Sequence, residues 1–356
     1  MITKLKSKIL GDKPKHRKTK IICTIGPSCK TEAGLRGLIE EGMDFARFNF
    51  SHGDLAEFQN WTKIIRKYSK KLDRKVEIIQ DLQGPRVRIG KMKHEGRHIV
   101  AGENIHLVFD VNEPLKRGEI LIQSDVDLEL KKGDKILMDK GLVELDIRKI
   151  NMPRVECKAL TSGLVFSGKG VNLPGSEAKQ SFTSKDYADL EEGLKMGVDW
   201  IALSFVESKK DVLEIREKVG DRAKIISKIE RPQAIQNFAE ILEVSDAVMI
   251  ARGDLGIEIP FWKLPSIQKR AIRRALNVGK PSIVATDMLA SMAVAKRPTR
   301  AEILDIANAV LDGASAVMLS EETAVGRYPH DAIISMRKIV EEAEEFAKSQ
   351  ELGSLL

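Results

Sequence analysis

The stretch Ile225–Ile259, IISKIERPQAIQNFAEILEVSDAVMIARGDLGIEI, contains the pattern on which the fold prediction depends. Its apolar runs predict one strand over 224–227 and a second over 246–250. Between them, residues 234–242 place apolar side chains at helical spacing, which predicts a helix. Two short apolar strands flanking one helix indicate a βαβ unit with parallel strands, and the carboxyl ends of such strands lie at the same edge of the sheet.

Charged residues follow both of these strands. Lys228 and Glu230 follow the first, and Arg252 and Asp254 follow the second. Two carboxylates from neighbouring strand ends can hold one Mg²⁺ and leave positions open for substrate oxygens. A lysine beside them suits a transferring phosphoryl group. For either residue alone, a plain ion pair between Lys228 and Glu230 is the better interpretation, but the complete set, with Gly253 allowing close backbone approach, favours a site.

Composition excludes several classes of protein. The 356 residues carry a net charge of +7 and no apolar run long enough to span a bilayer, and the N-terminus has no signal-peptide pattern. Three cysteines form no metal-ligand spacing, and their odd number argues against a disulfide framework. We therefore expect a cytoplasmic protein without a membrane partner. Residues 1–18 are basic but contain no interleaved aromatics, so we interpret them as a solvated tail and predict no nucleic-acid partner.

The order of predicted elements indicates a (β/α)8 barrel with an insertion. About eight strands alternate with about eight helices over 19–85 and 183–356, and that number closes a barrel. Residues 86–182 show no good helix and are predicted to be a small all-β lid domain inserted after the third strand. An open doubly wound sheet is the alternative, which we disfavour because no G-x-G-x-x-G follows any strand.

In a barrel, every strand end opens onto one mouth, where polar residues would converge. A lid that closed over this mouth would exclude water from a reaction such as phosphoryl transfer. The polar residues predicted at the mouth are Arg47, Asn49, Ser51, Asp81, Ser204, Lys228, Glu230, Arg252, Asp254 and Thr286.

Nine segments, in order along the chain, resemble those of one enzyme family. They are CTIGPS (23–28), ARFNFSHG (46–53), DLQGPRVR (81–88), KGVNLPG (169–175), ALSFV (202–206), SKIE (227–230), ARGDLGIEIP (251–260), RPTRAE (297–302) and DIANAVLDGASAVMLSEETAVGRYP (305–329). The chain resembles pyruvate kinase over about residues 18–347. The resemblance implies a barrel with an inserted β lid, and transfer of the phosphoryl group of phosphoenolpyruvate to ADP, which gives pyruvate and ATP in glycolysis.

The resemblance also implies roles for the matching residues. Glu230 and Asp254 would bind Mg²⁺ (or Mn²⁺), and Lys228 would stabilise the phosphoryl group and the enolate oxygen. Arg47 would contact the transferring phosphate, and Thr286 would help to deliver a proton to the enolate carbon. The implied substrate-binding residues are Arg252, Gly253, Asp254, Thr286 and Ser204, with the backbone amides of Gly253 and Asp254 holding the substrate carboxylate. The implied nucleotide-binding residues are Pro27, Arg47, Asn49, His52, Arg88 and Lys169.

Most members of the family also use potassium. The matching residues here are Asn49, Ser51, Asp81 and the backbone of Leu82. Arg86 occupies the lid-hinge position that is a glutamate in potassium-dependent members, and its fixed charge could replace the ion. We therefore expect activity without potassium.

The chain also departs from the family pattern. It stops at Leu356, where the family continues into a C-terminal regulatory domain, so sugar-phosphate or AMP allostery is not expected. A homodimer through the 297–302 region and the last helices is expected instead of a tetramer. Glu207, Asp287 and Glu321 replace neutral or basic residues and would add negative charge near the mouth, where each needs a partner.

Two other classes of function stay open from the sequence alone. The first is a non-catalytic pyruvate-kinase-like protein that binds phosphoenolpyruvate or nucleotide. The second is a lyase or aldolase, which would need the metal carboxylates but not a nucleotide lid.

Overall fold

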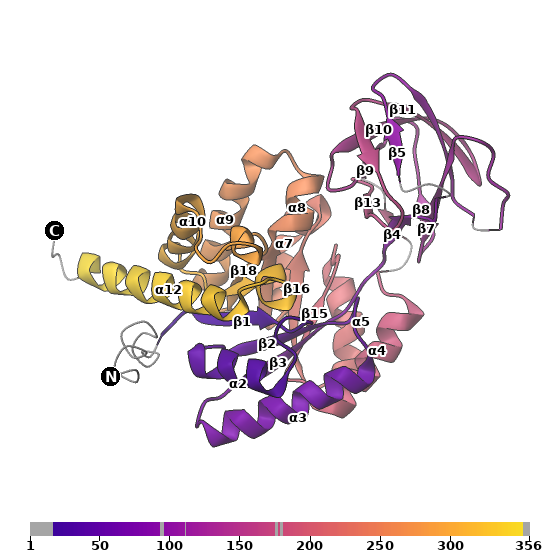
Figure 1. Cartoon of the computed structure of the whole chain (residues 1–356). Helices are drawn as coiled ribbons and strands as arrows, with labels where there is room; N and C mark the ends of the chain where they lie inside the picture. The colour runs from indigo at the N-terminus through magenta and orange to yellow at the C-terminus, as the bar shows by residue number, and fades with distance from the viewer. Residues whose placement is uncertain (1–16, 93–95, 111, 175–176, 179–180, 352–356) are drawn as a thin grey trace.

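The computed structural model describes residues 17–92, 96–110, 112–174, 177–178 and 181–351. Eight parallel strands close a barrel in the order β1-β19-β18-β17-β16-β15-β3-β2, which confirms the predicted barrel (Figure 1). Every neighbouring pair in this order is parallel, so all carboxyl ends open on one side. The barrel strands are β1 (Lys20–Thr24), β2 (Phe45–Asn49), β3 (Glu77–Asp81), β15 (Trp200–Leu203), β16 (Lys224–Ile229), β17 (Ala247–Ala251), β18 (Ser282–Ala285) and β19 (Ala316–Leu319).

Helices surround the barrel (Figure 1). They are α2 (Glu32–Glu41), α3 (Leu55–Lys71), α4 (Ser184–Met196), α5 (Lys209–Val219), α6 (Pro232–Gln236), α7 (Phe238–Val244), α8 (Arg252–Glu258), α9 (Leu264–Asn277), α10 (Arg300–Leu311), α11 (Glu321–Ala324) and α12 (Pro329–Glu351), with 3-10 turns at Phe261–Lys263 and Ala290–Ala293. The prediction of one helix over 234–242 is wrong. Two short helices meet at Asn237, whose side chain donates a hydrogen bond to the Glu207 carbonyl instead of facing solvent.

Apolar side chains fill two layers of the barrel. Inside it, residues such as Ile22, Ile79, Trp200 and Met249 form one cluster. A larger cluster fills the space between the strands and the helices. Because both faces of each strand are covered, the strands read as continuous apolar runs, and this is why the sequence predicted them well.

The chain between β3 and α4 forms the expected β insertion, which stands away from the barrel in Figure 1. Its strands are β4 (Val87–Ile89), β5 (Arg97–Ile99), β6 (Asn104–Val108), β7 (Glu119–Ser124), β8 (Leu128–Glu129), β9 (Lys135–Met138), β10 (Val143–Asn151), β11 (Arg154–Ala159), β12 (Gly163–Val165), β13 (Val171–Asn172) and β14 (Glu177–Ala178). Seven of them form one sheet, and the insertion has its own apolar core.

The connection from β3 into the insertion passes close to the barrel at Gly84. This glycine has φ +67, and a Cβ there would lie 3.0 Å from the Ser204 side chain and from the Phe205 ring. Its amide donates to the Asp186 carboxylate, which also caps α4. Glycine is therefore required both for the backbone conformation and for the close approach.

The described residues include no helix with the length and apolar character needed to cross a bilayer. Cys23, Cys29 and Cys157 are free thiols, each buried in apolar surroundings.

Candidate active site

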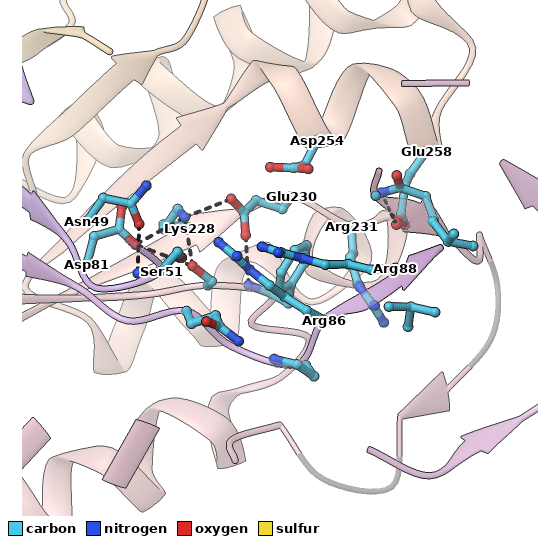
Figure 2. A pocket seen from close by; sticks show the side chains of 18 of the residues that line it. Asn49, Ser51, Asp81, Arg86, Arg88, Lys228, Glu230, Arg231, Asp254 and Glu258 are labelled. Carbon is cyan, nitrogen blue, oxygen red and sulfur yellow. Dashed lines mark hydrogen bonds and ion pairs between the residues drawn. The ribbon is translucent and has the colours of Figure 1, made fainter. Parts of the chain in front are cut away.

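A cavity of about 450 Å³ lies between the barrel mouth and the insertion. Side chains from both walls converge in it, as Figure 2 shows for ten labelled residues. The predicted site residues that line it are Arg47, Asn49, Ser51, His52, Asp81, Arg86, Arg88, Ser204, Lys228, Glu230 and Asp254. Most of these residues come from the carboxyl ends of β2, β3, β15, β16 and β17, where a barrel concentrates its functional groups.

Lys228 is the central cation of this cavity and is almost fully buried. Its Nζ lies 3.2 Å from Asp81 Oδ1, 2.7 Å from Ser204 Oγ and 3.0 Å from Glu230 Oε1. Burial alone would lower the pKa of Lys228, but Asp81 and Glu230 outweigh it and raise that pKa above its usual value. The ammonium group is therefore charged across the physiological pH range.

Asp81 anchors the other side of the lysine. Its Oδ2 accepts a hydrogen bond of 2.6 Å from Arg47 Nε, and Arg47 Nη1 donates to Thr24 Oγ1. Burial tends to raise the pKa of Asp81, but Lys228 and Arg47 hold it below its usual range. Asp81 is thus an ionised carboxylate that orients two cations toward the cavity.

Glu230 and Asp254 are the carboxylates predicted to bind Mg²⁺. Burial raises the pKa of Glu230 to about 7, and it also raises the pKa of Asp254. Glu230 Oε1 lies 3.0 Å from the Lys228 ammonium and accepts no other hydrogen bond, and no hydrogen bond to the Asp254 carboxylate is found among the described residues. Lys228 is shared between Asp81 and Glu230, so Glu230 and Asp254 together retain negative charge that a divalent cation can neutralise.

This pair of carboxylates fits a magnesium site. Mg²⁺ is bound by hard oxygen ligands and usually uses one or two protein carboxylates, with water and substrate oxygens completing its shell. Within the described part of the chain, no group of three or more His, Cys, Asp or Glu side chains is arranged to hold a metal. The two carboxylates of Glu230 and Asp254 are the number that an open magnesium site uses.

Three of the four potassium-type residues, Asn49, Asp81 and Leu82, have oxygens that already contact protein donors. Asn49 Oδ1 accepts from the Ser51 amide at 3.1 Å. The Leu82 carbonyl accepts from Ser204 Oγ at 2.7 Å, and both carboxylate oxygens of Asp81 contact cationic side chains.

Arg86 and Arg88 reach from the start of the insertion toward Lys228 and Glu230 (Figure 2). Neither guanidinium is within ion-pair distance of a carboxylate in the described residues. His52 lies nearby, and burial, together with Arg88 and Arg47, lowers its pKa. These residues leave two unneutralised positive charges facing the cavity, which favours an anionic ligand.

Three of the implied substrate residues do not line this cavity. Arg252 Nη1 instead pairs with Asp305 at 2.6 Å, and its other nitrogens donate to the Thr286 carbonyl. The Gly253 amide donates to Thr286 Oγ1 at 2.7 Å, so it already has an acceptor. Thr286 has φ +70, a strained conformation for a β-branched residue.

Two implied nucleotide residues and one cation-site residue also lie outside the cavity lining. Pro27 is exposed at the turn after β1. Lys169 pairs with Asp139 at 3.0 Å within the insertion, while its neighbours Gly168 and Gly170 line the cavity. Leu82 is buried and contributes only its carbonyl to the network around Ser204.

The three additional carboxylates do not crowd the cavity, since none of them is among its lining residues. Glu207 pairs with Arg231 at 2.5 Å. Glu321 is exposed at the start of α11. Asp287 has φ +54 in the turn after β18.

The sequence analysis missed several lining residues, namely Arg231, Phe205, Glu258 and Asn172. Asn172 Nδ2 donates to Glu258 Oε1 at 3.3 Å and so joins the insertion to α8. Burial raises the pKa of Glu258. Glu258 lies four residues after Asp254, on the same face of a helix, and this spacing was the available signal.

The comparisons with known proteins agree with this geometry. The family model described as pyruvate kinase, barrel domain, matches residues 16–333. The pyruvate kinase of Thermococcus litoralis is 41% identical over 343 residues, which cover 94% of this chain and 71% of that protein. The pyruvate kinase of Corynebacterium glutamicum is 44% identical over 332 residues, which cover 92% of this chain and 70% of that protein.

A solved structure gives the same result in three dimensions. The crystal structure of a pyruvate kinase from Cryptosporidium parvum superposes with a TM-score of 0.86 at 38% sequence identity, over 92% of this chain and 70% of that one. The motifs, the barrel with its β insertion and these similarities agree, and the chain belongs to the pyruvate kinase family of phosphotransferases.

Proposed function

We propose that this protein transfers the phosphoryl group of phosphoenolpyruvate to ADP, giving pyruvate and ATP. The observation that carries the proposal is the contact of Lys228 with both Asp81 and Glu230 in a cavity lined by the barrel mouth and the β insertion. A protein that only bound these ligands would not need a buried, charged lysine at the point where charge develops. The binding-only protein is the second candidate.

The residues would act as follows. Glu230 and Asp254 would hold Mg²⁺, which when bound neutralises charge on phosphate oxygens. Lys228 and Arg47 would stabilise the phosphoryl group while its bond to the enolate oxygen breaks and a bond to an ADP oxygen forms. A proton delivered near Thr286 would convert the enolate to pyruvate. Ser204 would orient Lys228, and the amides of Gly253 and Asp254 would contact the substrate carboxylate once Thr286 releases Gly253.

For the nucleotide phosphates we propose contacts with Arg88, Arg47, Asn49 and His52, all on the cavity wall. Pro27 and Lys169 stay in the proposed nucleotide site on the family resemblance alone. Their involvement requires movement of the insertion toward the barrel.

We also propose that the reaction does not require potassium. Two features support this proposal. Arg86 brings a permanent positive charge to the cavity, and the oxygens of Asp81 and Leu82 are already occupied by protein donors. Arg47 and Lys228, which already contact the two Asp81 oxygens, would repel a further cation at this position.

The test follows pyruvate formation from phosphoenolpyruvate, ADP and Mg²⁺ with sodium, potassium or tetramethylammonium as the monovalent cation. We expect equal turnover in all three and none in Lys228→Met. Turnover that appears only with potassium would refute the proposed role of Arg86 but not the kinase. Calorimetric binding of phosphoenolpyruvate without turnover in any salt would favour the binding-only protein.

For the quaternary structure we propose a homodimer through α10 and α12. These helices border a groove of about 530 Å³ lined by Ile303, Ala307, Leu311, Ile339 and Phe346. A second copy that buried this groove would remove exposed apolar surface. Sedimentation of the wild type and of Leu311→Glu would test the assignment.

A further inference from the structure

A strained turn lies beside the proposed metal carboxylate. Phe205 follows β15 and has φ +56, in the left-handed region that non-glycine residues rarely adopt. Its amide donates a hydrogen bond of 2.8 Å to Glu230 Oε2. With Oε2 bound to this amide, the other oxygen, Oε1, faces Lys228 and the cavity. Persistent strain at a functional site implies that neighbouring groups hold the turn in place.

Arg231 contacts this turn at two points, in addition to Asp211, which accepts from the Glu207 and Ser208 amides. The guanidinium lies over the Phe205 ring, 5.3 Å from its centroid, and pairs with Glu207 two residues farther along the same turn. The Glu207 carbonyl is fixed in turn by Asn237. Only 9% of the Arg231 side chain is exposed, so its contacts are scarcely screened by water. A planar guanidinium suits this double task because it can stack and pair at the same time.

We propose that Arg231 is a positioning residue for the metal site. By stacking on Phe205 and pairing with Glu207, it keeps the Phe205 amide directed at Glu230 Oε2, so that Oε1 is presented toward the position between Glu230 and Asp254. The inference rests on the proposed magnesium site and is independent of whether ADP is the acceptor. Hydrogen-bond donors that orient metal-binding side chains typically change metal affinity by 10-fold to 100-fold when they are lost.

The experiment measures Mn²⁺ binding to the complete, metal-free protein by electron paramagnetic resonance of free Mn²⁺. We expect Arg231→Gln to weaken Mn²⁺ binding by about 10-fold or more, because the turn relaxes and its amide leaves Glu230. Glu207→Gln removes the ion pair but leaves the stacking, so it should weaken binding less. Arg231→Lys keeps the charge without the planar stack, and its affinity should lie between those of the wild type and Arg231→Gln.

Arg216→Gln is the matched control. Arg216 pairs with Asp246 at 2.6 Å, also between neighbouring βα units, but at the opposite end of the barrel from the cavity. We expect this variant to bind Mn²⁺ as the wild type does. Thermal unfolding and far-UV circular dichroism would identify any variant that does not fold, and Glu207→Gln and Arg231→Lys would then still test the proposal.

Several results would overturn it. The first is an unchanged Mn²⁺ affinity in folded Arg231→Gln. The second is a loss of Mn²⁺ affinity in Arg216→Gln as large as that in Arg231→Gln, because this would indicate general destabilisation. A raised KM for phosphoenolpyruvate with unchanged Mn²⁺ affinity would show that Arg231 contacts substrate directly. A wild type that binds no Mn²⁺ would overturn both this inference and the proposed metal site. Normal Mn²⁺ behaviour without any pyruvate formation would overturn only the proposed reaction.

Discussion

Replacing Glu230 with glutamine should remove a pH-dependent loss of stability from the metal-free protein. Burial raises the pKa of Glu230 from the ordinary value of 4.5 to about 7, and the side chain is only 1% exposed. Between these two pH values the unfolded chain has released the proton while the folded protein retains it. Stability therefore falls as pH rises through this window and levels off above it.

The expected size follows from the same shift. A separation between 4.5 and about 7 corresponds to about 3 kcal/mol lost between pH 4.5 and pH 8, to order of magnitude. Glutamine has the same shape and cannot ionise. Titrating groups that do not interact with Glu230 contribute equally to both proteins and cancel in the difference between wild type and variant, whereas Lys228 and Asp254 respond to the Glu230 charge and contribute to that difference.

The assay is urea unfolding in EDTA from pH 5 to pH 8.5, followed by tryptophan fluorescence and circular dichroism. At each pH, the free energy of unfolding of Glu230→Gln is subtracted from that of the wild type. This difference should decrease by about 3 kcal/mol across the range. Exposed Glu217→Gln serves as the control and should track the wild type at every pH. Parallel curves for wild type and Glu230→Gln would refute the argument that ionised Glu230 is buried at a cost in the absence of metal.

Three further predictions follow from the site and the hinge. Lys228→Met should abolish measurable pyruvate formation. It should also lower the free energy of unfolding by about 3 kcal/mol or more, because Asp81 and Glu230 lose a buried cation. A urea titration that gives wild-type stability would contradict this. Gly84→Ala should lower the free energy of unfolding by about 1 to 3 kcal/mol, since φ is +67 and a Cβ would lie 3.0 Å from Ser204. An unchanged urea midpoint would show that the connection from β3 to the insertion accommodates the methyl group. Mg²⁺ at 100 times its dissociation constant should stabilise the wild type by about 2.7 kcal/mol in thermal scans. It should stabilise Asp254→Asn, which lacks the carboxylate, much less. Equal stabilisation of both proteins would place the metal elsewhere.

The barrel and the residues at its strand ends could be predicted from the chain alone. Strands such as β16 and β17 are buried on both faces, so they appear as apolar runs that need no tertiary information to recognise. Parallel strands then place every following polar residue at one mouth, and this is why Lys228, Glu230 and Asp254 were found together. The insertion was predicted as β structure, but its strand order was not, because the pairing of short strands depends on their partners.

The direction of each side chain was decided only by the tertiary structure. Arg252 and Lys228 both lie at the carboxyl end of a barrel strand. The guanidinium of Arg252, however, pairs with Asp305 on α10, and Arg252 does not line the cavity. Arg231 lacked any signal in sequence, because its partners Glu207 and Phe205 belong to a different βα unit. Spacing along a chain determines which strand end a residue occupies, whereas the charges and rings contributed by other strands determine where that residue points.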